Sequence, residues 1–198
     1  MKKEELEKVR NLLIVVDMVN GFVREGVMSN QNIEHIVPLV IKLVDLFTED
    51  NDSLVAFFKD THNEFAREFE KFPKHCIKNT TESENIDELK KYEKISLVYE
   101  KNSTCGLFAK GFLTDINKMK NLKKVVICGC CTDICVINLA IPLENYFDEN
   151  NKDIDIIVCE DAVETYDTVN HNAQEYNEMA FKLMKQSGIK LVKKYGGN

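Results

Sequence analysis

The sequence predicts an α/β fold of the doubly wound, three-layer type, with a mostly parallel six-stranded sheet and helices on both faces. Six short apolar runs rich in β-branched residues recur along the chain, and amphipathic helical segments lie between several of them. Consecutive parallel strands need right-handed crossovers, which place helices on both faces of the sheet. Because the 198 residues are 44% hydrophobic and no linker-like stretch divides them, we expect one domain over residues 1–198.

The expected strands are short and apolar enough to be buried on both sides of a parallel sheet. They are residues 11–16 (NLLIVV), 53–58 (SLVAFF), 95–99 (ISLVY), 124–129 (KVVICG), 154–159 (IDIIVC) and 189–192 (IKLV). Apolar residues at helical spacing predict helices over residues 32–50, 135–147 and 173–188, the last ending at Gly188.

Charge and the N-terminal sequence exclude several classes of protein. A formal net charge of −7 and a sequence pI near 5.2 disfavour a nucleic-acid partner, which would need a basic patch. The apolar run at residues 11–16 is too short for a signal-peptide core or a membrane span, so we expect a cytoplasmic protein with no membrane partner. Seven cysteines, an odd number, favour reduced thiols over a disulfide framework.

Chemically capable side chains follow the predicted strands. In open parallel sheets, ligands bind beyond the carboxyl ends of the strands. Here these positions hold Asp17, then Asp60 with His62, then Lys101, then the cysteines of GCCTDIC, then Asp161. An acid, a lysine and a thiol from three strands would therefore meet at one edge of the sheet. Taken singly, each also has a structural explanation: a turn-forming Asp, a solvated Lys and a buried Cys.

Four of the cysteines lie within residues 125–136 (VVICGCCTDICV), and their positions distinguish them. Cys128 lies in the strand and is expected in the core, whereas Cys130 and Cys131 belong to the turn. A structural zinc cage is a rival explanation. It is disfavoured because these three cysteines are too close together on an extended segment for the usual CxxC pairing.

Cys135 is the candidate nucleophile. Thr132 and Asp133 are suited to cap a helix, which would place Cys135 in the first helical turn. A helix N-terminus and a nearby ammonium both favour the thiolate, and a carboxylate within reach can accept the thiol proton. That carboxylate can later return the proton to a leaving group.

Residues 60–76 (DTHNEFAREFEKFPKHC) form a candidate metal site. Zinc, iron and manganese accept mixed imidazole and carboxylate ligands. This stretch supplies such ligands in Asp60, His62, Glu68 and His75. The block is also unusually apolar for a loop, so Phe69 and Phe72 are expected to line a pocket.

These motifs together resemble the isochorismatase-like cysteine hydrolase superfamily, and within it the nicotinamidases, over essentially the whole chain. The motifs are VVDMVNGF (15–22), DTH (60–62) with EFEKFPKHC (68–76), EKNSTCGLF (100–108) and GCCTDICV (129–136). The last is the most specific, because a Gly and two small residues precede Thr-Asp-x-Cys-Val.

The resemblance implies a triad of Asp17, Lys101 and Cys135 that hydrolyses nicotinamide to nicotinate and ammonia through a thioester. Cys135 would attack the carboxamide carbon, Asp17 would move the proton, and Lys101 would hold the thiolate and orient Asp17. It also implies an oxyanion hole from the backbone N–H groups of Cys131 and Cys135, with a cis peptide between Cys130 and Cys131.

The resemblance further implies a divalent metal, a ring-binding pocket and a homo-oligomer. The metal ligands would be Asp60, His62, His75 and, as in some members, Glu68. Phe22 and Phe72 would flank the nicotinamide ring, whose nitrogen would bind the metal.

Two departures from the nicotinamidase pattern concern the substrate and leave the triad intact. Many nicotinamidases carry Gln and Asp where this chain has Val19 and Gly21. Many also carry Trp where this chain has Phe72.

Three hypotheses follow from the sequence. The first is an amidohydrolase acting on nicotinamide, and the second is a sister cysteine hydrolase acting on another small amide or a carbamoyl compound. The third is a non-catalytic protein that binds a metal or a small ligand. A metal held by Asp60, His62 and His75 favours the first, and an unreactive Cys135 would favour the third.

Overall fold

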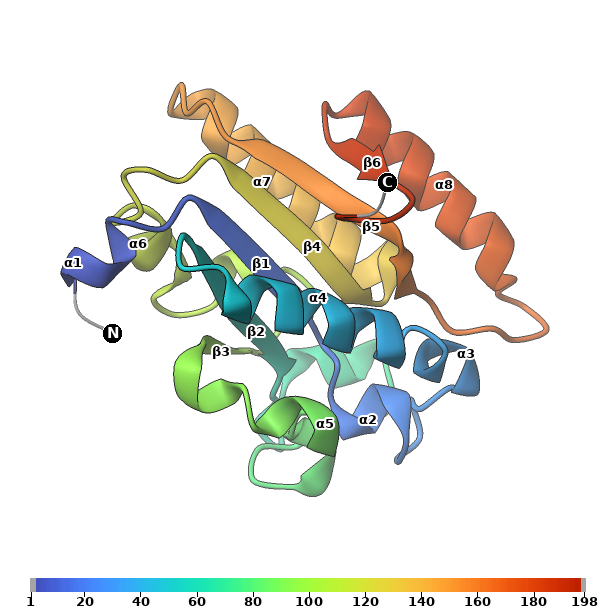
Figure 1. Cartoon of the computed structure of the whole chain (residues 1–198). Coiled ribbons are helices and arrows are strands. Elements are labelled where there is room, and N and C mark those ends of the chain that lie inside the picture. The colour runs from blue at the N-terminus through green and yellow to red at the C-terminus, as the bar shows by residue number, and fades with distance from the viewer. Residues whose placement is uncertain (1–2, 197–198) are drawn as a thin grey trace.

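The computed structural model describes residues 3–196 and contains a parallel sheet of six strands in the order β3-β2-β1-β4-β5-β6 (Figure 1). The strands are β1 (Asn11–Val16), β2 (Ser53–Asp60), β3 (Leu97–Lys101), β4 (Lys124–Cys130), β5 (Asp155–Glu164) and β6 (Lys190–Val192). Every neighbouring pair is parallel. The predicted fold class is confirmed, and the sheet is parallel throughout.

Helices cover both faces of this sheet, as the predicted crossovers require. The helix α4 (Val37–Glu49) packs on one face, and α7 (Ile137–Glu149) and α8 (Ala173–Gln186) pack on the other (Figure 1). The short helices are α1 (Lys3–Leu6), α2 (Asn20–Val23), α3 (Gln31–Glu34), α5 (Asp87–Lys90) and α6 (Phe112–Ile116).

The hydrophobic core has two parts because alternate strand residues point to opposite faces. In β1, Leu12 and Ile14 belong to the part beneath α7 and α8, whereas Leu13 and Val15 belong to the part beneath α4. All four side chains are fully buried. This core holds the strand ends rigidly, so side chains that follow them have fixed positions.

Several predicted boundaries are wrong, each for a local reason. The helix expected over residues 32–50 is two helices, because Pro38 starts α4 in its first turn. The third strand, β3, begins at Leu97, two residues later than predicted, because Glu93–Ile95 form a 3₁₀ turn that exposes Ile95. β5 continues to Glu164, five residues beyond its predicted end, so Asp161 lies inside the strand. Gly188, with φ of 92°, ends α8 as expected.

None of the helices in the described part of the chain is both long and apolar enough to cross a lipid bilayer.

Candidate active site

The candidate site lies where the order of the strands reverses, between β1 and β4. Connections from these two central strands go to opposite sides of the sheet, which leaves a crevice at their carboxyl ends. Asp17 follows β1 directly, and the turn that carries Cys131 and Cys135 follows β4. A cavity of about 350 Å³ opens here.

Gly129 brings β4 close enough to β1 to form this crevice. Its φ is 111°, and a Cβ atom at this position would stand 2.0 Å from the Val16 carbonyl oxygen. Only glycine fits, because any side chain would collide with the β1 backbone. Asp17, the residue that follows Val16 at the end of β1, also has a left-handed backbone, with φ of 52°. Its N–H donates to the Phe58 carbonyl at 2.9 Å, which fixes its orientation.

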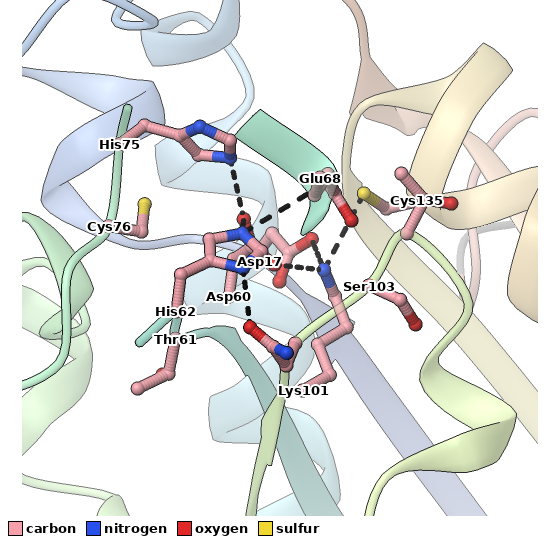
Figure 2. A network of polar contacts seen from close by, with 12 residues as sticks. Asp17, Asp60, Thr61, His62, Glu68, His75, Cys76, Lys101, Ser103 and Cys135 are labelled. Carbon is pink, nitrogen blue, oxygen red and sulfur yellow. Dashed lines mark hydrogen bonds and ion pairs between the residues drawn. The ribbon is translucent and has the colours of Figure 1, made fainter. Parts of the chain in front are cut away.

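Lys101 connects the catalytic candidates (Figure 2). This side chain is almost fully buried at the end of β3. Its Nζ lies 2.8 Å from Asp17 Oδ2 and 2.8 Å from Asp60 Oδ1, and 3.7 Å from the Cys135 sulfur. The structure therefore brings Asp17, Lys101 and Cys135 together, as their strand-end positions predict.

The protonation of these three groups follows from burial and from one another's charge. Burial raises the pKa of Asp17 to about 6, although Lys101 opposes the shift. Burial would lower the pKa of Lys101, but the Asp17 and Asp60 carboxylates raise it well above its ordinary value. Burial also raises the pKa of the Cys135 thiol well above its ordinary value, and Lys101 only partly offsets this. The expectation of a lowered thiol pKa is therefore wrong.

A protonated thiol needs a base at the moment of attack, and Asp17 is placed to supply one. Asp17 Oδ2 and the Cys135 sulfur both lie beside Lys101 Nζ, at 2.8 Å and 3.7 Å. Among the described residues, neither Asp17 oxygen accepts a well-aligned hydrogen bond, so the Lys101 contact is an ion pair. A buried carboxylate with a raised pKa and free acceptor capacity is suited to take and return a proton.

The turn that carries Cys135 differs from a capped helix start. The cis peptide implied by the family resemblance is present between Cys130 and Cys131. Residues Thr132–Val136 then form a π-helical turn, a feature frequent at functional sites, before α7 begins. The Cys131 carbonyl accepts from the Val136 N–H at 3.0 Å. Neither Thr132 nor Asp133 caps the helix, so that prediction is wrong.

Four potential metal ligands gather beside Lys101. The ligand atoms of Asp60, His62, Glu68 and His75 all lie within 4.8 Å of one another. Asp60 Oδ2 is 2.8 Å from His62 Nε2 and 3.0 Å from His75 Nε2. Glu68, on the 3₁₀ turn Arg67–Glu70, is more distant, at 4.0 Å from His62 Nε2.

The chemistry of this donor set fits a divalent metal ion. His75 Nδ1 faces the Pro73 carbonyl at 2.7 Å, so it must carry the proton, and His62 Nδ1 faces Asn102 Oδ1 at 2.9 Å. A neutral ring protonated at Nδ1 presents its Nε2 lone pair, and both lone pairs point at the Asp60 carboxylate. Three acceptors that converge in this way repel one another unless a metal ion or protons lie between them. Burial opposes protonation of the imidazoles, but contact with Asp60 raises the pKa of both His62 and His75. The outer partners of the two Nδ1 atoms are typical of metal-binding histidines.

Asp60 belongs to both groups. Its Oδ2 faces the two imidazoles, and its Oδ1 faces Lys101 (Figure 2). Burial opposes ionisation, but Lys101 and the imidazole contacts hold the pKa of the Asp60 carboxyl well below its ordinary value. The candidate metal site and the candidate nucleophile therefore share one carboxylate.

Two of the three aromatic residues predicted for the pocket lie at its wall, and the prediction for Phe69 is wrong. Phe22 and Phe72 both line the cavity, with ring centroids 5.5 Å and 6.4 Å from that of His75. Phe69 does not line it. Its ring packs against His62 and His75, at centroid distances of 5.2 Å and 5.7 Å, and supports the metal ligands from behind.

Several site residues were not predicted from the sequence. Asn102, which holds His62, directly follows Lys101 and could have been inferred from its strand-end position. Ile134 and Tyr166 line the cavity. Tyr166 lies just beyond the end of β5 at Glu164, and the predicted end of this strand at residue 159 is too early for the strand-end rule to indicate it.

Packing explains why position 21 is a glycine. A Cβ atom at Gly21 would stand 2.6 Å from the sulfur of Cys76, which is fully buried. An Asp at this position, as in many nicotinamidases, would therefore collide with this chain's own Cys76. Val19 is fully buried, so the polar pair of those relatives is replaced here by apolar packing.

Fold and site together define a doubly wound α/β protein with a buried carboxylate–lysine–thiol cluster beside a metal donor set. The sequence profile of the isochorismatase domain matches residues 11–194. The chain therefore belongs to the isochorismatase family.

Similar proteins include amide-cleaving enzymes. Nicotinamidase 1 of Arabidopsis thaliana is 31% identical over 143 residues, which are 64% of this chain and 57% of that protein. The structure of Pyrococcus horikoshii pyrazinamidase in complex with zinc is 26% identical and superposes with a TM-score of 0.75, covering 94% of this chain and 99% of that one. N-carbamoylsarcosine amidase of Thermoplasma acidophilum is 25% identical with a TM-score of 0.74, covering 96% and 100%.

Proposed function

We propose that this protein is a cysteine-dependent amidohydrolase that converts nicotinamide to nicotinate and ammonia. The observation that carries the proposal is the position of Lys101, 2.8 Å from Asp17 and 3.7 Å from the Cys135 sulfur, behind a cavity lined by Cys135 and by three of the four candidate metal ligands. The similarity to the Arabidopsis nicotinamidase supports the choice of substrate.

The first half of the reaction acylates Cys135. Asp17 accepts the thiol proton as the sulfur attacks the carboxamide carbon, and Lys101 stabilises the developing thiolate. Backbone N–H groups of Cys131 and Cys135 would bind the oxygen of the tetrahedral intermediate. Asp17 returns the proton to the nitrogen, the C–N bond breaks, and ammonia leaves a thioester on Cys135.

The second half of the reaction hydrolyses the thioester. Asp17, ionised again, takes a proton from water as the water oxygen attacks the thioester carbon. The C–S bond breaks, nicotinate forms, and the proton returns to the Cys135 sulfur. A base with a pKa of about 6 can both accept and release a proton near neutral pH.

Asp60, His62, His75 and Glu68 would hold the metal ion. The ion would supply a Lewis-acidic contact for the ring nitrogen of the substrate and so orient the amide. Zinc, iron and manganese all suit this mixed donor set, and the zinc complex of the similar Pyrococcus horikoshii pyrazinamidase supports zinc among them. Phe22 and Phe72 would enclose the ring.

The cavity also favours a neutral substrate over an anionic one. Of the described residues that line it, none is lysine or arginine, and Asp60 and Glu68 would be engaged by the metal ion. A carbamoyl amino acid such as N-carbamoylsarcosine carries a carboxylate that would find no cationic side chain on this wall. This observation disfavours the carbamoyl alternative.

We further propose that the protein is cytoplasmic and forms a homo-oligomer. All seven cysteines are free thiols, which suits a reducing compartment.

The test is ammonia release from a panel of amides by zinc-loaded protein. We expect release from nicotinamide, slower release from benzamide, which lacks the ring nitrogen, and none from N-carbamoylsarcosine. Release from N-carbamoylsarcosine alone would contradict the proposed substrate. When the reaction is quenched during turnover, mass spectrometry should show a nicotinoyl group on Cys135. The absence of an acyl group from every cysteine would contradict the thioester.

A further inference from the structure

His171 lies in an unusual environment close to the nucleophile turn. It lies in the loop between β5 and α8 and is 6% exposed. Its ring is stacked between Tyr166, at 3.8 Å and an interplanar angle of 15°, and Tyr176, at 3.7 Å and 23°. Two nearly parallel aromatic faces prevent the imidazole from tilting.

The edges of the ring are fixed as well. His171 Nδ1 lies 2.9 Å from the Tyr166 carbonyl oxygen, and Nε2 lies 2.9 Å from Asp133 Oδ2. Both ring nitrogens therefore lie within hydrogen-bonding distance of an oxygen atom. The imidazole is therefore held on its two faces and at both nitrogens.

Asp133 connects this ring to the nucleophile. It lies two residues before Cys135 in the π-helical turn Thr132–Val136. Among the described residues, its other oxygen, Oδ1, has no hydrogen-bond partner. The hydrogen bond with His171 is thus what connects the Asp133 side chain to the loop between β5 and α8.

We propose that His171 is a positioning residue that, through Asp133, holds the Thr132–Val136 turn so that the Cys135 sulfur faces Lys101 and Asp17. The inference rests on the proposed function only in taking Cys135 as the nucleophile. His171 does not line the cavity, so it acts without touching substrate. A loss of positioning of about 1 Å at a reacting atom typically lowers the rate by roughly a hundredfold.

The decisive variants keep or remove one hydrogen bond. In Asp133→Asn, the amide can donate to His171 Nε2 while Nδ1–H still donates to the Tyr166 carbonyl, so the bond survives without the charge. Asp133→Ala removes it, as does His171→Ala. Tyr176→Leu removes one stacking face, and Tyr176→Phe keeps it. His35→Ala, at an exposed histidine, is the matched control.

The first readout is the rate at which iodoacetamide alkylates Cys135, localised by tandem mass spectrometry. We expect His171→Ala and Asp133→Ala to lower this rate about tenfold or more, Tyr176→Leu to lower it less, and Asp133→Asn, Tyr176→Phe and the control to stay near wild type. An unchanged or faster rate in Asp133→Ala would overturn the proposal. So would an equal loss in Asp133→Asn, which would mean that the retained hydrogen bond is irrelevant.

The second readout is the split between kcat and KM for ammonia release. A positioning role predicts a lower kcat in Asp133→Ala at nearly constant KM, with recovery in Asp133→Asn. A change confined to KM would overturn it, since that outcome assigns the loop to substrate binding. If wild-type protein releases no ammonia from nicotinamide, the proposed substrate fails, and the alkylation series still decides the role of His171. Asp133→Asn and Asp133→Ala decide it even if His171→Ala does not fold.

Discussion

Replacing Lys101 with methionine should destabilise the fold through two carboxylates at once. The lysine is 3% exposed and lies 2.8 Å from both Asp17 and Asp60, so its removal leaves buried negative charge without its partner. Breaking a buried ion pair in this way typically costs about 3–5 kcal/mol. For a chain of this size, each kcal/mol lowers the melting temperature by about 2–4 °C. We therefore expect Lys101→Met to melt roughly 6–20 °C below wild type.

A second variant separates this electrostatic effect from lost packing. In Lys101→Met with Asp17→Asn, one of the stranded charges is gone, and His62 and His75, when protonated, still pair with Asp60. Asparagine tolerates the left-handed backbone of position 17. The double variant should therefore melt above Lys101→Met and remain inactive.

The assay is thermal unfolding followed by circular dichroism, with all proteins treated with chelator at one pH near neutrality. Chelation matters because a bound metal would add its own stabilisation. A Lys101→Met protein that melts within about 2 °C of wild type would refute the reasoning, because the cited cost could not then be present. A double variant no more stable than the single one would refute the electrostatic part.

Three further predictions concern pH, metal and backbone. Because burial raises the pKa of Asp17 to about 6 and the base must be ionised, kcat/KM should fall as the pH drops through about 6, and a flat profile from pH 5 to 8 would exclude Asp17 as the base. His75→Ala should lower the zinc content, measured by plasma mass spectrometry after dialysis, by at least tenfold, whereas the exposed His35→Ala should not. Gly129→Ala should cost ~4 kcal/mol or more in urea unfolding because of the 2.0 Å collision with Val16. Gly111→Ala, with a similar φ of 93° and its nearest neighbour, Tyr99 Cε1, at an uncrowded 4.0 Å, should cost only ~1–2 kcal/mol. Equal costs at the two glycines would show that the collision is relieved.

Much of the site was predictable because it follows from topology. A run of buried β-branched residues identifies a central parallel strand, and the carboxyl ends of such strands meet at one edge. That rule brought together Asp17, Lys101 and the cysteines of the turn after β4, and the family resemblance selected Cys135 among them. Residue types then identified Asp60, His62 and His75 as a donor set, since few other groupings of imidazole and carboxylate occur in the chain.

The remaining features depend on distances that no local pattern encodes. The cap expected from Thr132 and Asp133 failed because the cis peptide and the π-helical turn leave no ordinary helix start there. The thiol pKa was predicted in the wrong direction because the sequence shows the nearby lysine but not the burial that outweighs it. His171 was missed because its partners come from three separate segments.

The most direct test compares ammonia release from nicotinamide by wild-type protein, Cys135→Ala and Cys105→Ala under the same zinc-loaded conditions. Cys105 is a half-buried thiol on the segment after Lys101, so its replacement controls for the loss of a cysteine near the site. We expect wild type and Cys105→Ala to release ammonia and Cys135→Ala, folded and melting near wild type, to release none above background. Ammonia release by a folded Cys135→Ala protein would contradict the assignment of Cys135 as the nucleophile.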